Sequence, residues 1–129
     1  MKTRLWNRVK RKFEDKFIIY NDGRICVING NSRTYVNDNP NYKLCYCVGL
    51  KDKNGKDIFE GDILKEQYPT DEGIDYDVTL VVYSRERAAF VLTHPNYPDD
   101  VMSFDIVELN NIEIIGTVFE NEGLLNEYE

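Results

Sequence analysis

The fold is decided by one stretch of the chain, Tyr42-Lys-Leu-Cys-Tyr-Cys-Val-Gly-Leu-Lys-Asp-Lys-Asn-Gly-Lys-Asp-Ile-Phe-Glu-Gly-Asp-Ile-Leu64. In residues 42–50 successive side chains fall on alternate faces, which is the pattern of a β-strand. Asn54-Gly55 then supplies the positive φ angles of a tight hairpin turn. Asp57–Phe59 returns along the first strand, and Glu60-Gly61-Asp62 forms a second sharp corner. The stretch therefore predicts antiparallel β-structure.

The composition of the whole chain supports the same fold class. Val, Ile, Thr, Tyr, Phe and Trp together account for 44 of the 129 residues, whereas Ala occurs twice. β-branched and aromatic side chains fit a pleated, half-buried surface, while Ala is the best helix former. A chain of this length suits one domain and buries about two-thirds of its unfolded surface. We expect a single all-β, mainly antiparallel domain that needs no disulfide or metal.

Segments on either side of the deciding stretch predict further hairpins and loops. Asn21-Asp22-Gly23 separates two apolar runs and favours a tight turn, and Ser84–Arg87 separates two more. The acidic stretch 69–77 and the proline-containing stretch 94–100 are interpreted as loops. At the C-terminus, Asn121 can N-cap one last helical turn.

The first sixteen residues allow two interpretations. Leu5, Val9 and Phe13 recur every four residues, which fits one stripe of an amphipathic helix. The same residues also fit two short strands around a basic turn, Arg8–Lys12. Local sequence does not choose between them.

Charge is distributed unevenly along the chain, whose net charge is −7. Residues 1–16 carry seven basic and two acidic side chains, and residues 99–129 carry nine acidic and no basic ones. An acidic balance disfavours non-specific nucleic-acid binding, because phosphate contacts supply most of that affinity. Opposite charges at the two ends can meet within one fold or between neighbouring copies.

The cellular location is predicted from segments that the sequence does not show. No run of eighteen apolar residues predicts a membrane span, and no apolar segment follows the basic N-terminus as in a signal peptide. The three cysteines, Cys26, Cys45 and Cys47, are too few and odd in number for a secreted disulfide framework. We expect reduced thiols in a cytoplasmic protein with no membrane partner.

The candidate catalytic and metal-binding residues each have a simpler structural explanation. Cys45 and Cys47 share a strand face, yet a zinc site needs four ligands, and only Cys26 and His94 remain to complete it. His94 is interpreted as an exposed loop residue without a nucleophile beside it. Glu60 and Asp62 suit a tight corner as well as they suit acid–base chemistry. The acidic stretch 71–77 lacks the spacing of a calcium loop. We predict no catalytic residue, metal or cofactor.

One stretch is a candidate contact surface for nucleic acid or a partner. Cations near an aromatic ring can hold single-stranded nucleic acid, although a lone tryptophan in an apolar pattern is more often part of a core. The residues concerned are Arg4, Trp6, Arg8, Lys10, Arg11 and Lys12.

Three segments carry a family resemblance. Val48–Leu64, with its Asn-Gly turn and Glu-Gly-Asp corner, resembles the signature of the YopX-like proteins of bacteriophages and prophages. Ile112–Leu125 resembles the closing segment of that family, and Arg4–Asn7 resembles its opening, where Asp is usual in place of Asn7. The signature positions are interpreted as structural, and they are Gly49, Asn54, Gly55, Gly61, Asp62 and Gly116.

The resemblance implies a small barrel-like domain, residues 48–129, with an N-terminal β extension, residues 1–47, and a short C-terminal helical turn. It also implies a phage or prophage origin and work in a bacterial cytoplasm. It favours strands over a helix for residues 2–13, and it implies no reaction.

Two functions compete. The first is a non-enzymatic binding module that associates with itself or with a host or phage protein, consistent with the polarised charge and the missing catalytic set. The alternative is a nucleic-acid-binding protein that uses the basic N-terminal stretch. An enzyme is not expected.

Overall fold

The computed structural model describes residues 2–94, 97–121 and 123. About 60% of the structure is strand and 5% is helix, and among the described residues no helix reaches seven residues. The strands form antiparallel sheets, one of them curled into a half-barrel, which confirms the predicted all-β fold class. The chain divides into two compact units, Lys2–Cys45 and the part from Tyr46 onward. None of the described helices is long and apolar enough to span a membrane.

The N-terminal unit begins with a hairpin of β1 (Thr3–Asn7) and β2 (Lys12–Phe13), followed by a three-stranded sheet. Residues 2–13 are therefore strand, turn and strand. Trp6 lies opposite Phe13 in the hairpin, and the adjacent Leu5 is also buried. Neighbouring residues on opposite faces are typical of a strand, whereas the helical interpretation required Val9 to be buried, and Val9 is 73% exposed.

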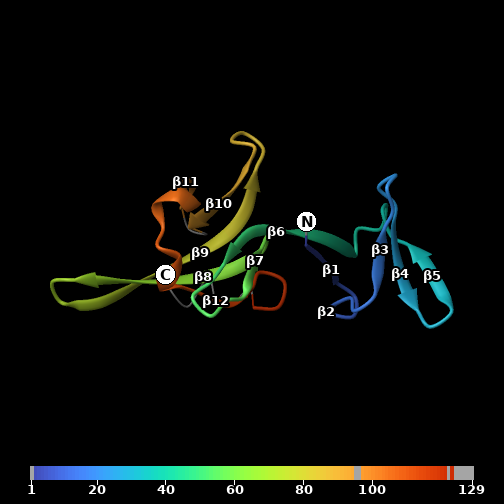
Figure 1. Ribbon diagram of the computed structural model, residues 1–129, viewed down its shortest axis with the longest axis horizontal. Helices are drawn as coiled ribbons and strands as arrows, with labels where there is room; N and C mark the ends of the chain where they lie inside the picture. Colours follow the sequence, from blue (N-terminus) through green and yellow to red (C-terminus); the bar gives the residue numbers. More distant parts are fainter. Residues whose placement is uncertain (1, 95–96, 122, 124–129) are drawn as a thin grey trace. The chain divides into compact units, whose positions relative to one another are not determined.

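The three-stranded sheet of this unit places β4 between its two partners (Figure 1). The strands are β3 (Phe17–Ile19), β4 (Ile25–Asn29) and β5 (Ser32–Tyr35). Their buried side chains join those of β1 in a small core. Its members are Leu5, Val27 and Val36, with Phe17, Ile25, Tyr42 and Leu44 packed around them.

The strand β6 (Tyr42–Lys51) begins in the N-terminal unit and continues into the C-terminal unit, where it pairs with β7 (Asp57–Phe59). The predicted hairpin turn forms between them, with φ of 79° at Gly55, but φ is not positive at Asn54, so it is not the two-residue turn with two positive φ angles that the Asn-Gly pair predicts. The register of this pair shifts between Cys47 and Lys51, around Gly49.

The C-terminal unit contains a five-stranded sheet in the order β11-β10-β9-β8-β12 (Figure 1). Its strands are β8 (Asp62–Thr70), β9 (Gly73–Ser84), β10 (Ala89–His94), β11 (Tyr97–Ser103) and β12 (Ile112–Thr117). Two short 3₁₀ helices, η1 (Phe104–Ile106) and η2 (Leu109–Asn111), connect β11 to β12. The buried core of the unit consists of Ile58, Leu64, Val81, Leu92 and Ile112.

Two predicted loops are strands. The acidic stretch 69–77 is the end of a long β8–β9 hairpin, and β11 occupies residues 97–103. Pro69 is tolerated because β12 pairs with β8 only as far as Glu66, so no strand on that side needs an N–H from Pro69. Similarly, β11 is the edge strand that holds Pro98. The helical turn predicted after Asn121 lies largely outside the described residues.

Candidate functional site

The basic turn, Arg8–Lys12, joins β1 to β2 and is held in shape by the side chain of Asn7. Asn7 Oδ1 accepts hydrogen bonds from the backbone N–H groups of Val9 and Lys10, both at 3.1 Å. Asn7 Nδ2 donates to Glu14 Oε1 at 2.6 Å, and both residues are buried. Because a buried side chain fixes the backbone of the turn, the turn is preorganised for contact.

The four cations of this turn, Arg8, Lys10, Arg11 and Lys12, are all exposed. The two remaining residues of the predicted contact stretch are placed differently. Trp6 is only 5% exposed, and its ring meets the edge of Phe13 with 5.0 Å between centroids. The Arg4 guanidinium lies 4.4 Å from the centroid of Phe13. The structure therefore brings four of the six predicted residues together on the turn and places Trp6 in the interior.

The signature residue Asp62, and Asp52 in the same Val48–Leu64 stretch, accept hydrogen bonds from backbone N–H groups. Asp52 Oδ1 accepts from the N–H groups of Asn54 and Lys56, each at 2.9 Å, and Oδ2 accepts from Ile114 N at 3.1 Å. Burial acts to raise the pKa of Asp52, but these three hydrogen bonds outweigh it and hold that pKa below its ordinary value. Asp62 Oδ2 accepts from Phe59 N at 2.8 Å, and Asp62 is 1% exposed.

The signature glycines stand where the backbone bends. Gly61 has φ of 91°, and a Cβ atom there would lie 2.6 Å from Phe119 Cε2. Gly49 has φ of 92° within the register shift of β6, and Gly116 follows the register shift of β12. Such bulges bend a strand and allow a sheet to curl.

The three cysteines are buried. Among the described residues, no group of three or more His, Cys, Asp or Glu side chains is placed to hold a metal ion.

His94 is not the exposed loop residue that the sequence suggested. It ends β10 and is half-buried, with Nε2 2.7 Å from Asp77 Oδ1 and Nδ1 3.2 Å from Asp100 Oδ2. On β8, burial raises the pKa of Glu66 against a backbone hydrogen bond from Glu108 that lowers it, and the Asp77 carboxylate adds to the rise. The contacts of His94 with Asp77 and Asp100 link the β9, β10 and β11 strands.

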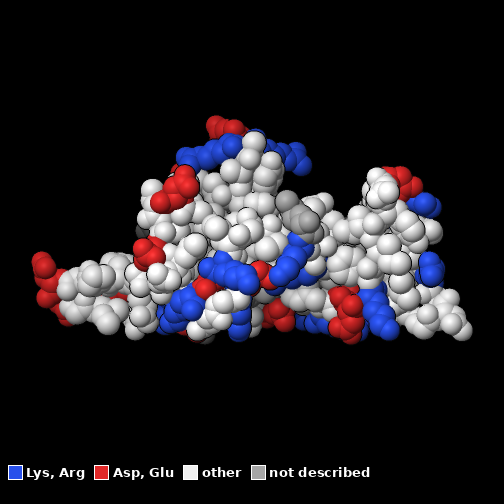
Figure 2. Space-filling view, viewed as in Figure 1, with Lys and Arg blue, Asp and Glu red and all other residues white. Residues whose placement is uncertain are grey.

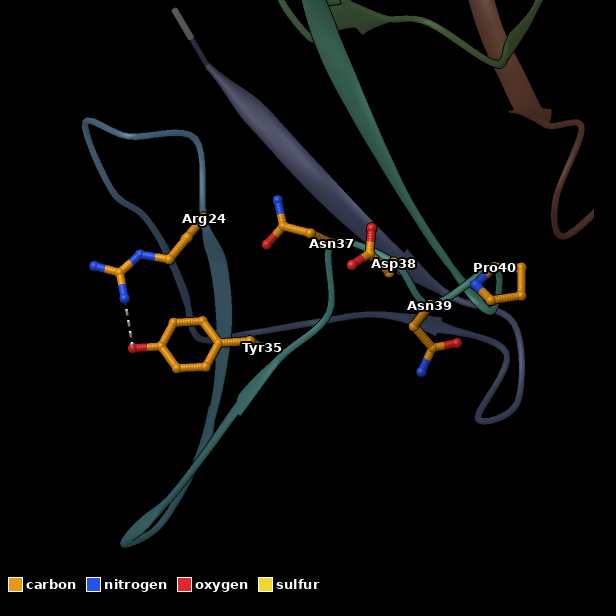
Figure 3. Close-up of a pocket in the computed structure, with 6 residues that line it drawn as sticks. All are labelled: Arg24, Tyr35, Asn37, Asp38, Asn39 and Pro40. Atoms are coloured by element: carbon orange, nitrogen blue, oxygen red, sulfur yellow. Dashed lines mark hydrogen bonds between the residues drawn. The ribbon is translucent and has the colours of Figure 1, made fainter.

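A shallow groove on the N-terminal unit, about 540 Å³ in volume, was not expected from the sequence. Figure 3 shows that its lining comes from the start of β4, the end of β5 and the segment after β5. The lining residues are Arg24, Tyr35, Asn37, Asp38, Asn39 and Pro40.

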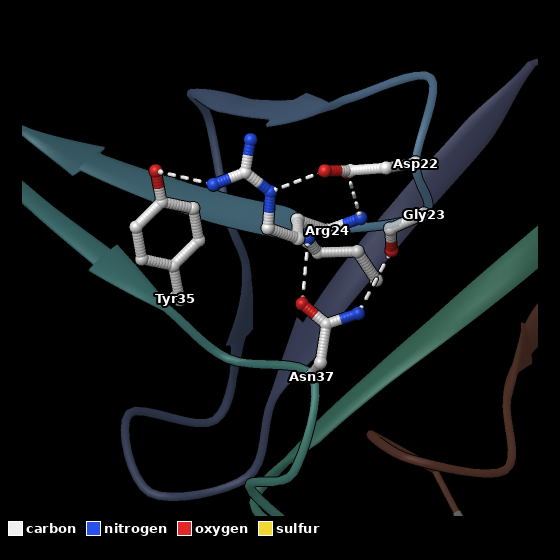
Figure 4. Close-up of polar contacts among 6 residues, drawn as sticks. Asp22, Gly23, Arg24, Tyr35 and Asn37 are labelled. Carbon is white, nitrogen blue, oxygen red and sulfur yellow. Dashed lines mark hydrogen bonds and ion pairs between the residues drawn. The ribbon is translucent and has the colours of Figure 1, made fainter.

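Arg24, Tyr35 and Asn37 of this groove make polar contacts with one another or with the neighbouring Asp22–Ile25 segment (Figure 4). Arg24 Nε lies 2.7 Å from Asp22 Oδ2, and the guanidinium lies over the rings of Tyr20 and Tyr35. The Arg24 backbone N–H, followed by the Arg24 side chain, lowers the pKa of Asp22 despite the opposing effect of desolvation. Asn37 accepts from Ile25 N at 2.7 Å and donates to the Gly23 carbonyl at 2.8 Å. These contacts brace two hairpins and leave no acid, base and nucleophile arranged together there.

The sequence gives only a weak signal for the cluster of Tyr20, Arg24 and Tyr35. Tyr20 and Arg24 flank the Asp22-Gly23 turn, whereas Tyr35 comes from the next hairpin. Their proximity depends on the pairing of β4 with both neighbouring strands.

The comparisons with known proteins agree with this architecture. The sequence model described as "YopX protein" matches residues 2–126, which is nearly the whole chain. The chain belongs to the YopX family. A solved structure, protein EF1440 from Enterococcus faecalis, has the same fold, with a TM-score of 0.66, 24% identity and coverage of 96% of each chain. No curated protein matches the sequence. Family membership therefore accounts for the signature, and the similar structure supports the fold alone.

Proposed function

We propose that this YopX family member is a non-enzymatic binding module whose contact element is the basic turn, Arg8–Lys12. The observation that carries the proposal is the combination of exposure and rigidity in that turn. Its four cations face solvent, while buried Asn7 holds the backbone beneath them. A preorganised charged loop loses little conformational entropy when it binds. An acidic protein surface is the partner that fits it.

The roles of the signature residues support a non-enzymatic function. Asp52 and Asp62 bind backbone N–H groups, and Gly61 fits beneath Phe119, so these residues have sufficient structural reasons to be present. A catalytic carboxylate would need an oxygen directed at a substrate in a cleft. The groove around Arg24 is lined by groups that brace the fold.

Nucleic acid is the second candidate partner, because four clustered cations also suit phosphate. Burial of Trp6 argues against base stacking by this tryptophan, which is the feature that strengthens single-strand binding. Binding through the turn would then rest on phosphate contacts and fall steeply with salt.

We further propose that the protein originates from a bacteriophage or prophage and acts in the cytoplasm of a bacterial host. The family resemblance supports the origin, and three buried cysteines, too few and odd in number for a secreted disulfide framework, are compatible with a reducing compartment.

Cross-linking mass spectrometry in bacterial cells tests the proposed contact element. Wild type is compared with Arg11→Glu/Lys12→Glu and with the matched control Arg85→Glu/Arg87→Glu, which changes net charge equally on the exposed turn between β9 and β10. We expect cross-links near residues 8–12 to acidic segments of a protein partner, lost in the first variant and kept in the control. Equal loss in both variants, or partner cross-links only elsewhere, would refute the proposal.

Fluorescence anisotropy with single-stranded DNA, duplex DNA and RNA tests whether nucleic acid, the second candidate partner, binds the turn. At about 50 mM salt we expect no binding that depends on the turn. Binding that Arg11→Glu/Lys12→Glu abolishes and the control keeps would instead assign the turn to nucleic acid.

A further inference from the structure

The end of the β8–β9 hairpin extends beyond the strands that flank its base. β12 pairs with β8 only as far as Glu66, and β10 pairs with β9 only as far as Leu80. From Gln67 to Tyr76 the two strands pair with each other, and Figure 1 shows this hairpin reaching away from the rest of its sheet. A two-stranded ribbon of this kind is marginally stable alone and commonly gains stability from a further contact.

One face of this hairpin end is apolar. Pro69 lies opposite Ile74, and Gln67 lies opposite Tyr76, so alternation places these side chains on the same face. Ile74 is 67% exposed and Tyr76 is 44% exposed. Pro69 and Ile74 line a shallow groove of about 180 Å³. The Lys65 ammonium lies 4.1 Å from the centroid of the Tyr76 ring, and further out Pro69 and Ile74 form an exposed apolar surface on this projecting element.

The turn and the opposite face of this hairpin end are acidic. Asp71 and Glu72 form the exposed turn, and Asp75 lies opposite Tyr68 on the other face; the far end of the hairpin is correspondingly red in Figure 2. On that other face Asp75, followed by desolvation and then Asp77, raises the pKa of Tyr68 above its ordinary value. An occupant that offers both positive charge and apolar surface therefore fits the acidic turn together with the apolar face.

The basic turn has that chemistry. Its cations surround Val9, whose side chain is 73% exposed. We propose that the end of the β8–β9 hairpin, residues 67–76, with its apolar face and its acidic turn, binds the basic turn of a second copy of this chain. The inference rests on the proposed function and specifies its partner. Because the two surfaces differ, the contact is heterologous and generates a ring or an open chain of copies.

Charge-swapped variants of the full chain test this pairing. Arg11→Glu/Lys12→Glu lowers the net charge of the turn from +4 to zero, and Asp71→Lys/Glu72→Lys changes that of the hairpin end from −3 to +1. All four side chains are exposed, and circular dichroism verifies that each variant folds. Size-exclusion chromatography with light scattering measures assembly over a range of protein concentrations at about 25 mM and about 500 mM NaCl, where charges are screened over about 20 Å and about 4 Å respectively.

We expect wild type to assemble at low salt in a concentration-dependent way and to dissociate at high salt. Each variant alone should associate at least tenfold more weakly, whereas an equal mixture of the two should form pairs, because the unaltered acidic hairpin end of the first variant meets the unaltered basic turn of the second. The control Arg85→Glu/Arg87→Glu should assemble like wild type.

A wild-type monomer at low salt at every concentration tested would overturn the inference, as would assembly that both variants retain. If the chain is monomeric while the turn still cross-links to an acidic foreign protein, the proposed function stands and the self-pairing fails. If neither contact occurs, both fail.

Discussion

Replacing Asp52 by Asn should destabilise the protein severely, although the two side chains have nearly the same shape. The carboxylate of Asp52 accepts three backbone N–H groups, two from the hairpin turn after β6 and one from Ile114 on β12. An amide offers one oxygen and one NH₂ group, so at least one buried N–H would face another donor. The remaining hydrogen bonds would also lose their charge.

The size of the effect follows from these contacts. One unsatisfied buried donor costs about 1–3 kcal/mol, and losing charge assistance at two further bonds adds about 1 kcal/mol. We expect Asp52→Asn to lower the free energy of unfolding by about 2–4 kcal/mol in total. With a urea m-value of about 1.5 kcal/mol per molar, the midpoint should fall by about 1–3 M.

Urea unfolding followed by far-ultraviolet circular dichroism measures this change. Asp71→Asn, in the exposed hairpin turn, is the matched control for loss of one negative charge and should remain within about 0.5 kcal/mol of wild type. An Asp52→Asn variant as stable as that control would refute the structural role assigned to Asp52.

The pH dependence provides a second measurement on the same variant. The pKa of Asp52 is lower in the folded state than its ordinary value. Its stabilisation is therefore present above about pH 4 and is lost as the pH falls through the folded value. The difference between wild type and Asp52→Asn should narrow in acid, and a constant difference from about pH 7 to pH 3 would contradict this explanation.

Three further predictions follow from buried positions. Gly61→Ala should cost about 1–3 kcal/mol more than Gly49→Ala in thermal unfolding, because both glycines have φ near 90° but only Gly61 would place a Cβ against Phe119; equal costs would show that the Phe119 contact is unimportant. Asn7→Asp should destabilise the fold at neutral pH through repulsion with Glu14, and Glu14→Gln should restore most of the loss, which double-mutant unfolding measures. The three cysteines should react with a thiol reagent slowly in the native protein and together after unfolding, whereas rapid native labelling would contradict their burial.

The parts of the fold that the sequence predicted depend on local backbone chemistry. Asn54-Gly55 and Asp22-Gly23 favour tight turns whatever surrounds them, and both form hairpin turns in the structure. Residues 69–77 were wrongly interpreted as a loop, apart from the turn at Asp71 and Glu72, because their acidic side chains and Pro69 are unfavourable in a central strand. Their pairing depends on the register of β8 and β9, which is established nearer the core, where buried Ile63 lies opposite Leu80. A short window of sequence does not contain that information.

The residues of the candidate site likewise fall into those that the sequence predicted and those that it did not. The exposed cations of the basic turn were recognisable as a charge run, but the role of Asn7 was not, because it depends on a hydrogen bond to buried Glu14. Likewise, the environment of His94 is determined by Asp77 on the neighbouring strand, seventeen positions away in the sequence. The role of such a side chain depends on a partner on another strand, so it can be assigned only once the pairing of the strands is known.

The residues that the bends of the β-sheets require are poor candidates for partner contact, because they lie inside the fold. Asp62 is buried beneath its corner, and Gly61 has no side chain to present. Any partner must therefore contact positions at which the backbone tolerates many residues, such as Lys12 in the basic turn and Glu72 at the hairpin end. Exposed substitutions there should change stability by less than about 0.5 kcal/mol. Binding could then be altered by charge alone while the β-sheets remain intact, and the charge-swapped pair tests that separation directly.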